Sequence, residues 1–369
     1  MTSGTLAYPR YITKLDDVVQ LDPDERQKLK EVTKKFAFRA NDYYLSLINW
    51  DDPGDPIRNI IIPRYSELED SNVLDPSDES KYTILPGLQH KYPPTALLLT
   101  NDFCGGFCRY CFRKRLFMNI GSEEVARSID KRIDYIREHT EITNVLLTGG
   151  DPLLLPTKKL QPIIDAVAAI PHVRIIRIGS KMPAFNPYRI IRDKQLPQLI
   201  SDTSTSSKKV YIMTHFTHTN EITDVAKEAI EILQHSGAIM CNQTPILRGI
   251  NDKVSVLSGL LKELTFIGIA PYYIFQCRPT AGNKTYSVPL EEAFKVFNDS
   301  KEKVSGLAKR VKFVLSTKRG KLQVVGFQNG KIVFSHHEPV DLSKHGTLEP
   351  FDCDPEKYWY DEYLDESIS

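Results

Sequence analysis

Residues 100–115 read TNDFCGGFCRYCFRKR, and this stretch places three cysteines within eight residues. Cys104, Cys108 and Cys111 have the spacing C-x3-C-x2-C, and basic residues follow directly. A structural zinc site needs four ligands, usually from two separated pairs, and the sequence offers no second pair. Three thiolates around a four-iron cluster leave one iron with an open position, where a small molecule can bind through an amine and a carboxylate. The stretch therefore predicts an iron–sulfur site and no zinc.

Short apolar segments alternate with amphipathic segments from about residue 95 onward. The predicted strands are 96–101, 144–150, 174–180, 209–215, 238–243 and 270–276, and the predicted helices between them are 122–139, 158–170, 187–200, 221–237 and 254–268. Such alternation is typical of a parallel sheet with crossover helices. About six repeats without a Gly-rich dinucleotide fingerprint favour a partial (β/α)6 barrel of the α/β class. The chemically distinctive residues then lie at the C-terminal ends of the strands, where barrel active sites are found.

We expect three parts in the chain: an N-terminal extension of helices and loops over 1–90, the barrel over 91–285, and a C-terminal segment over 286–369. The chain has 369 residues, with 48 basic and 47 acidic side chains. This balance gives no reason to expect nucleic acid or an anionic membrane as a partner. Apolar runs are too short for a membrane span and no secretory signal is visible, so we expect a cytoplasmic protein.

A series of motifs carries a resemblance to a known family. In order along the chain, from about residue 85 to about residue 340, they are CRYCFRKR (108–115), VLLTGGDPLLL (145–155), RIIRIGSKMP (174–183), THFTHTNEIT (214–223), NQTPILRGIND (242–252) and PYYIFQC (271–277). Together they resemble the lysine 2,3-aminomutase family of radical S-adenosylmethionine (SAM) enzymes. The resemblance implies an isomerase that moves an α-amino group to Cβ, with a [4Fe-4S] cluster, SAM and pyridoxal 5′-phosphate (PLP) as cofactors. It also implies a reductase, flavodoxin or ferredoxin as electron donor, and a homo-oligomer.

The resemblance assigns a SAM pocket beside the three cysteines, which would hold the cluster. Gly149 and Gly150, followed by Asp151, come after the second strand, where glycine lets the backbone approach a ligand closely. His215 and Gln243, after the fourth and fifth strands, match residues that line the SAM pocket in the family.

The resemblance also implies that a lysine near the C-terminus carries PLP. In the family this lysine closes a glycine-rich loop, and the closest match here is STKRGKLQ (316–323), in which Lys321 follows a single glycine. Lys318 is the rival, and Lys321 is favoured by its position directly after the glycine. Lys91, Tyr92 and Lys181 match groups that hold the PLP phosphate.

The predicted substrate pocket departs from the lysine-specific pattern. Arg113 matches the arginine that binds the substrate carboxylate, for which a planar guanidinium is well suited. Where the family has an acid after the sixth strand, this chain has Arg278, and at the second acidic position it offers only Leu315 and Ser316. An ammonium beside Arg278 would be repelled and an anion attracted, so glutamate is the favoured substrate. Otherwise Arg278 turns outward or pairs with an internal acid such as Asp151.

Three alternative functions stay open at this point. The first is a lysine or arginine 2,3-aminomutase whose acidic residues come from elsewhere in the chain. The second is the related enzyme that isomerises lysine before the lysine is attached to a translation elongation factor, and Arg278 counts against this alternative too. The third is a PLP-independent radical SAM enzyme with another reaction.

Overall fold

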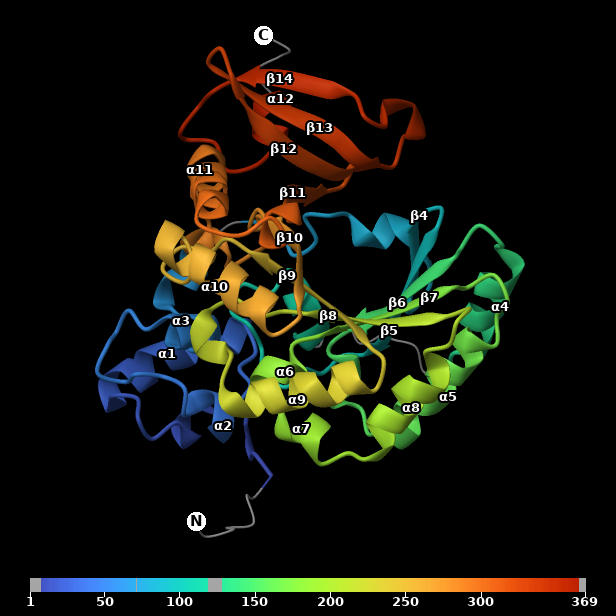
Figure 1. Cartoon of the computed structure of the whole chain (residues 1–369). Coiled ribbons are helices and arrows are strands. Elements are labelled where there is room, and N and C mark those ends of the chain that lie inside the picture. The colour runs from blue at the N-terminus through green and yellow to red at the C-terminus, as the bar shows by residue number, and fades with distance from the viewer. Residues whose placement is uncertain (1–7, 71, 119–127, 365–369) are drawn as a thin grey trace.

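The computed structural model describes residues 8–70, 72–118 and 128–364 (Figure 1). Its centre is one twelve-stranded sheet in the order β14-β13-β12-β11-β10-β9-β8-β7-β6-β5-β4-β3. The sheet does not close on itself, because β14 and β3 form its two edges in the described residues. No helix in this part of the chain is long and apolar enough to cross a membrane.

The middle of the sheet is parallel, as the alternating pattern predicts. Its strands are β5 (Thr95–Asn101), β6 (Asn144–Gly149), β7 (Ile175–Ser180), β8 (Lys209–Thr214), β9 (Ile239–Pro245), β10 (Ala270–Phe275) and β11 (Lys312–Thr317). The helices that connect them are α4 (Asp130–Glu138), α5 (Thr157–Ala168), α6 (Met182–Phe185), α7 (Tyr188–Ile191), α8 (Gln195–Thr203), α9 (Asp224–His235), α10 (Val254–Phe266) and α11 (Leu290–Glu302). The predicted partial barrel of six β/α units is confirmed, and β11 adds a seventh parallel strand. Part of the predicted helix 122–139 lies outside the described residues.

Alternation of buried and half-buried residues shows which face of the sheet the helices cover. On β6, Val145 and Leu147 are fully buried in the main apolar core, as are the residues that pair beside them on β7. The intervening positions, among them Thr148 and Arg177, are only half-buried. Because successive side chains of a strand point to opposite faces, these polar residues face away from the helices. The barrel interior therefore carries polar side chains.

Antiparallel strands extend the sheet at both ends. β3 (Thr83–Leu85) and β4 (Leu88–Tyr92) precede β5, while β12 (Gly320–Gln328), β13 (Lys331–Pro339) and β14 (Leu348–Asp352) follow β11. Figure 1 shows β12 to β14 at the end of the molecule opposite the N-terminal helices, with α12 (Asp361–Leu364) beside them. The sheet thus crosses both proposed part boundaries, near residues 91 and 286.

The N-terminal extension consists of α1 (Pro23–Lys35), α2 (Asp42–Leu45), α3 (Pro56–Ile61) and the short pair β1 (Tyr11–Ile12) and β2 (Ala40–Asn41). Helix α1 begins where the Asp22 side chain accepts hydrogen bonds from two backbone N–H groups, with proline at the first helical position.

This extension packs on the cysteine stretch rather than standing apart. Arg39 donates a hydrogen bond to the Cys104 carbonyl (2.8 Å), and Asn41 donates to the Gly105 carbonyl (3.1 Å). Arg109 forms a buried ion pair with Glu67 (2.7 Å). The sequence contains no motif that predicts this covering role.

Two glycines fix the approach of the cysteine stretch to β6. A Cβ atom at Gly149 would lie 2.5 Å from the Asn101 carbonyl oxygen, and a Cβ atom at Gly150 would lie 2.0 Å from the Phe103 carbonyl oxygen. Gly149 also has a φ of +112°, which other residues rarely adopt. The Gly150 N–H donates to the Asn101 carbonyl (2.7 Å), and the Asp151 N–H donates to the Phe103 carbonyl (2.6 Å). Because neither position has a side chain, the backbone of residues 101–103, which leads to Cys104, can lie directly against the end of β6.

We predict that Gly150→Ala destabilises the protein and displaces the cysteine stretch. Overpacking of this kind costs about 1–3 kcal/mol, and here the clashing atoms belong to backbone. The midpoint of urea unfolding should fall. Gly179→Ala is the matched control on the adjacent strand, because its Cβ would meet nothing closer than 3.7 Å. Equal unfolding midpoints for the two variants would contradict the packing role given to Gly150.

Candidate active site

The three cysteines lie together after β5, as the spacing predicts. Burial raises the pKa of the Cys104 thiol well above its usual value, and the nearby charge of Asp151 raises it too. Cys108 and Cys111 also raise this pKa, because they lie close enough to Cys104 for their charges to affect it. Burial also raises the pKa of Cys108 to about 12 and raises that of Cys111. These thiols are half-buried, and with pKa values raised in this way they need a metal cation to become thiolates.

In the part of the chain that the structure describes, no three His, Cys, Asp or Glu side chains converge on one metal ion. A cluster with a separate iron for each thiolate does not require such convergence, and three thiols at the mouth of a barrel fit that donor set.

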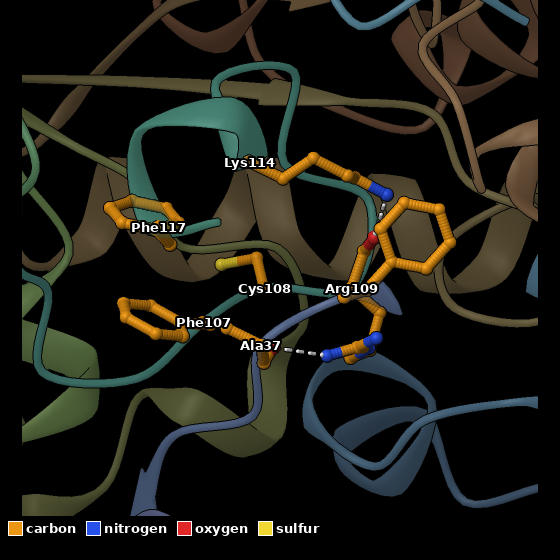
Figure 2. A pocket seen from close by; sticks show the side chains of 7 residues that line it. Ala37, Phe107, Cys108, Arg109, Lys114 and Phe117 are labelled. Carbon is orange, nitrogen blue, oxygen red and sulfur yellow. Dashed lines mark hydrogen bonds between the residues drawn. The ribbon is translucent and has the colours of Figure 1, made fainter. Parts of the chain in front are cut away.

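A small pocket beside Cys108 is walled by aromatic rings (Figure 2). Phe107 and Phe117 stack with their ring centres 4.2 Å apart, and the Lys114 ammonium lies 4.7 Å from the centre of the Phe36 ring. Burial lowers the pKa of Lys114 to about 8, and its ammonium donates to the Arg109 carbonyl (2.9 Å). The pocket therefore combines aromatic rings with the side chains of Arg109 and Lys114 beside Cys108.

Asp151 is a buried anchor at the end of β6. Its carboxylate accepts hydrogen bonds from the Lys181 N–H (2.7 Å) and the Leu153 N–H (3.0 Å). Burial raises its pKa to about 6, although these hydrogen bonds and one from Ser180 oppose the rise. The carboxylate therefore holds the end of β7 against the end of β6. Asp151 forms no ion pair with Arg278.

Lys181 and His215 lie together on the cysteine side of the site. The Lys181 ammonium pairs with Glu221 (2.6 Å) and donates to the His215 carbonyl (2.6 Å). The His215 Nε2 atom lies 3.1 Å from the Tyr110 hydroxyl, and burial, followed by the charge of Lys181, lowers the pKa of His215 well below its usual value. Glu221 also accepts a hydrogen bond from Tyr44 (2.6 Å), so it joins the N-terminal extension to the barrel.

The predicted role of Lys181 at the PLP phosphate stays a prediction, although its partners lie on the cysteine side of the site. The resemblance groups it with Lys91 and Tyr92 around one phosphate, whereas its charge acts on Cys108 and its buried partner is Glu221. A buried ammonium needs a carboxylate, and the acid available on this side of the barrel is Glu221. Gln243 is half-buried on β9, where it pairs with Tyr273 of β10, so its predicted role at the SAM pocket stays a prediction.

Lys321 is enclosed and Lys318 is exposed. The Lys321 side chain is 18% exposed and forms an ion pair with Glu338, and its ammonium lies 4.4 Å from the centre of the Tyr92 ring. Lys318 is 50% exposed and pairs with Asp361 at 3.4 Å. The geometry therefore supports Lys321 as the lysine that carries PLP.

Lys91 and Tyr92 lie near Lys321, as predicted. The Lys91 ammonium donates to the Thr317 carbonyl (2.6 Å). Burial, together with the positive charges of Arg278 and Lys321, lowers its pKa to about 8. Burial raises the pKa of the Tyr92 hydroxyl. A cluster of buried cations beside a lysine is a suitable place for a phosphate.

Arg113 is held by a carboxylate from the N-terminal extension. Glu79 accepts hydrogen bonds from Arg113 Nε (3.1 Å) and Nη2 (2.8 Å), and it also accepts one from Arg115 (2.6 Å). The remaining Arg113 nitrogen donates to Thr148 on β6 (3.1 Å). Burial alone would raise the pKa of Glu79, but Arg113, Arg115 and Arg278 hold it far below its usual value. Glu79 thus occupies the bidentate edge of Arg113 predicted to bind substrate.

Arg278 turns inward, next to this group. Its guanidinium lies 3.8 Å from the centre of the Phe112 ring, and Nη1 is sealed from solvent without a hydrogen-bond partner among the described residues. Burial lowers its pKa to about 10, and the nearest opposing charge comes from Glu79. Both open alternatives for Arg278, outward orientation and pairing with Asp151, are therefore wrong.

Four important residues were not identified from the sequence: Glu67, Glu79, Glu221 and Glu338. Each is a carboxylate that neutralises a buried arginine or lysine across a long stretch of chain. An isolated glutamate has no local pattern that distinguishes it from a solvent-exposed one, so spacing alone offers no signal.

An open parallel barrel with three clustered cysteines after its first strand defines a radical SAM protein. In agreement, residues 98–255 match the family model of the Radical SAM superfamily. The chain is 52% identical over 357 residues to a protein of Aquifex aeolicus provisionally named an L-lysine 2,3-aminomutase, covering 96% of this chain and 95% of that protein. It is 34% identical over 357 residues to the L-lysine 2,3-aminomutase of Fusobacterium nucleatum (96% and 82% covered). It is 36% identical over 306 residues to the glutamate 2,3-aminomutase of Clostridioides difficile (80% and 69% covered).

The chain belongs to the lysine 2,3-aminomutase family, and the predicted resemblance is confirmed. It is an isomerase with a [4Fe-4S] cluster, SAM and PLP as cofactors. The residues described above fit these groups: clustered thiols for iron, and an enclosed lysine among cations for PLP.

We predict that Glu79→Ala lowers the free energy of unfolding by about 3–5 kcal/mol, because it leaves buried guanidinium groups without their carboxylate. Urea unfolding at pH 7 measures the effect. Glu31→Ala is the control, since Glu31 pairs with Lys34 at the exposed surface (2.6 Å) and its loss should cost less than about 1 kcal/mol. Similar losses in both variants would contradict the assigned role.

The same carboxylate predicts a dependence on pH. Since the pKa of Glu79 is lowered in the folded protein, its stabilising contribution is complete above the unfolded value of about 4.3 and is lost as the pH falls further. The difference in unfolding free energy between the wild type and Glu79→Gln should shrink below about pH 4. A constant difference between pH 7 and pH 3 would argue against an ionised Glu79.

Proposed function

We propose that this enzyme is a 2,3-aminomutase for an acidic amino acid, with glutamate as the substrate and Lys321 as the PLP-bearing residue. The observation that carries the substrate assignment is Arg278. Its Nη1 atom is sealed from solvent without a hydrogen-bond partner among the described residues, next to a second arginine, at the position where the sequence resemblance implies an acid in lysine-specific members. An unpaired buried charge is costly, and an anionic side chain of the substrate would remove that cost.

The charge balance around Lys321 and Arg278 supports an anionic substrate. The cations are Arg113, Arg115, Arg177, Arg278, Lys91 and Lys321, and the acids that act on them are Glu79, Asp75, Asp78 and Glu338. The excess of positive charge suits one phosphate together with one dicarboxylic amino acid.

A lysine or arginine substrate is the alternative, and the names of two relatives favour lysine. Its distal cation would need a carboxylate, but two of the acids closest to the cations, Glu79 and Glu338, are already paired, and a third, Asp75, lies 3.9 Å from Arg115. Glu79 pairs with Arg113 and Arg115, and Glu338 pairs with Lys321. We therefore favour glutamate over both basic amino acids.

The chain's own residues bind and orient the reacting groups. Arg278 would receive the distal carboxylate, and Arg113, oriented by Glu79 and Thr148, would present its Nη1 side to the α-carboxylate. Phe112 supports the Arg278 guanidinium from below its plane. Lys91 and Tyr92 would hold the phosphate beside Lys321.

When bound, the reduced cluster with SAM supplies one-electron chemistry that breaks a C–H bond, and PLP supplies a conjugated system that spreads an unpaired electron. The protein holds Cβ of the substrate close to the reacting carbon and excludes water and oxygen.

We predict that Lys321→Ala abolishes the visible absorbance of lysine-bound PLP, whereas Lys318→Ala keeps it. The reason is burial: Lys321 is enclosed among the cations, and Lys318 is at the surface. Absorbance spectra of PLP-treated protein, with peptide mass spectrometry after borohydride reduction, provide the measurement. Retention of the label in Lys321→Ala would refute the assignment and would place PLP on another lysine.

We also predict that Arg278→Gln lowers kcat/KM for glutamate about 30-fold or more, since loss of one partner of a buried charged pair costs about 2 kcal/mol or more. Arg278→Lys keeps the positive charge but removes the planar guanidinium, so its kcat/KM for glutamate should fall less. Anaerobic steady-state assays with dithionite, SAM and PLP measure both variants. Unchanged glutamate kinetics in Arg278→Gln would place the distal carboxylate elsewhere.

A further inference from the structure

The surroundings of Lys321 contain an acid whose position depends on an irregularity in the sheet. Lys321 on β12 pairs directly with Glu338 on β13, but the next residue, Leu322, pairs with His336. His337 is therefore an extra residue, as in a β-bulge, where the pairing shifts by one position. Bulges redirect side chains and are common next to active sites. Here both His337 and Glu338 reach the hydroxyl of Tyr273 on β10.

These side chains form a continuous chain of contacts that ends at Lys321. The His337 Nε2 atom lies 2.9 Å from the Tyr273 hydroxyl. The Tyr273 hydroxyl donates to Glu338 Oε1 (3.3 Å), and Glu338 Oε2 forms the ion pair with the Lys321 ammonium. The His337 Nδ1 atom lies 3.5 Å from the Lys312 ammonium at the outer end. Each oxygen of the Glu338 carboxylate thus has a separate partner.

Gly320, the glycine that precedes Lys321, makes this approach possible. Its φ is +123°, and a Cβ atom there would lie 2.3 Å from the Glu338 carbonyl oxygen and 2.7 Å from the Pro339 Cα atom. Any other residue would push β13 away from β12 at this point. The single glycine of the STKRGKLQ motif therefore brings Glu338 opposite Lys321.

The charges that face Lys321 come from five places in the fold. Glu338 and His337 lie on β13, Arg177 on β7, Arg278 after β10, Tyr273 on β10, and Lys91 and Tyr92 on β4. Burial, Arg177 and Arg278 disfavour the ammonium form of Lys321, and among these groups Glu338 is the one that favours it. Without this carboxylate, Lys321 would face cations and neutral hydroxyl and imidazole groups.

We propose that Glu338 is the positioning residue for Lys321 and the acceptor of its proton, an inference that rests on the proposed role of Lys321 in carrying PLP. The ammonium of Lys321 gives one proton to the Glu338 carboxylate. Its nitrogen then forms a bond to the aldehyde carbon of PLP, and the aldehyde oxygen leaves as water. When the amine of the substrate displaces Lys321, the freed nitrogen takes the proton back. Tyr273 and His337 hold the carboxylate in place throughout.

The test is the pH dependence of PLP attachment to the full-length protein. PLP is added between about pH 6 and pH 10, and the growth of the visible band is followed, with borohydride reduction and peptide mass spectrometry to locate the label. Glu338→Gln should move the midpoint of the attachment rate to lower pH by about one to three units, because a carboxylate in contact raises the pKa of an amine by that amount. The plateau rate, at which the amine is already neutral, should fall because the carboxylate that positions the nitrogen is lost.

Glu338→Asp keeps the carboxylate at a greater distance and should shift the midpoint less in the same direction; it carries the test if the glutamine variant does not fold. Asp352→Asn is the matched control, because Asp352 pairs with Lys331 at the exposed edge of the same sheet. A midpoint in both Glu338 variants equal to that of the wild type would overturn the inference while leaving Lys321 as the attachment site. Covalent label in Lys321→Ala would instead overturn the proposed function itself.

Discussion

Buried positive charge has to be matched by negative charge, and this requirement organises the site. Four glutamates meet it: Glu67 for Arg109, Glu79 for Arg113 and Arg115, Glu221 for Lys181, and Glu338 for Lys321. Removing one partner of such a pair leaves an uncompensated charge that costs several kilocalories per mole. The pairs of Glu67 and Glu79 therefore join the N-terminal extension to the barrel, whereas Lys181–Glu221 lies within the barrel and Lys321–Glu338 joins two C-terminal strands.

One cation of the site, Arg278, does not fully meet this requirement for a matching negative charge. Arg278 is half-buried as a residue, yet its Nη1 atom is sealed from solvent and has no hydrogen-bond partner in the described part of the chain. Stability alone would disfavour such a residue, since a buried donor without an acceptor pays the full cost of desolvation. In a site that binds an anionic substrate, the substrate supplies the missing acceptor, so the cost is removed only when the substrate is bound. Selectivity would then come from charge, because a basic substrate would leave the cost in place.

The local features of the fold were predictable from the sequence, and the pairings across the fold were not. The β/α alternation identified β5 to β10, and the spacing of Cys104, Cys108 and Cys111 identified the cluster site, because both patterns lie within short stretches. The pairing of Lys181 with Glu221 was not predicted, because the two residues are 40 positions apart and Glu221 has no motif of its own. Glu79 and Glu338 were missed for the same reason, and the bulge at His337 depends on a strand register that no local pattern records.

Competition between amino acids tests the charge-based assignment most directly. The full chain, reconstituted anaerobically with iron, sulfide, SAM and PLP and reduced with dithionite, is given equimolar glutamate, lysine and arginine. Mass spectrometry after derivatisation measures the three β-amino acids, whose initial ratio equals the ratio of kcat/KM values. We predict that β-glutamate predominates. Formation of β-lysine or β-arginine without β-glutamate would contradict the role of Arg278 and the acidic substrate.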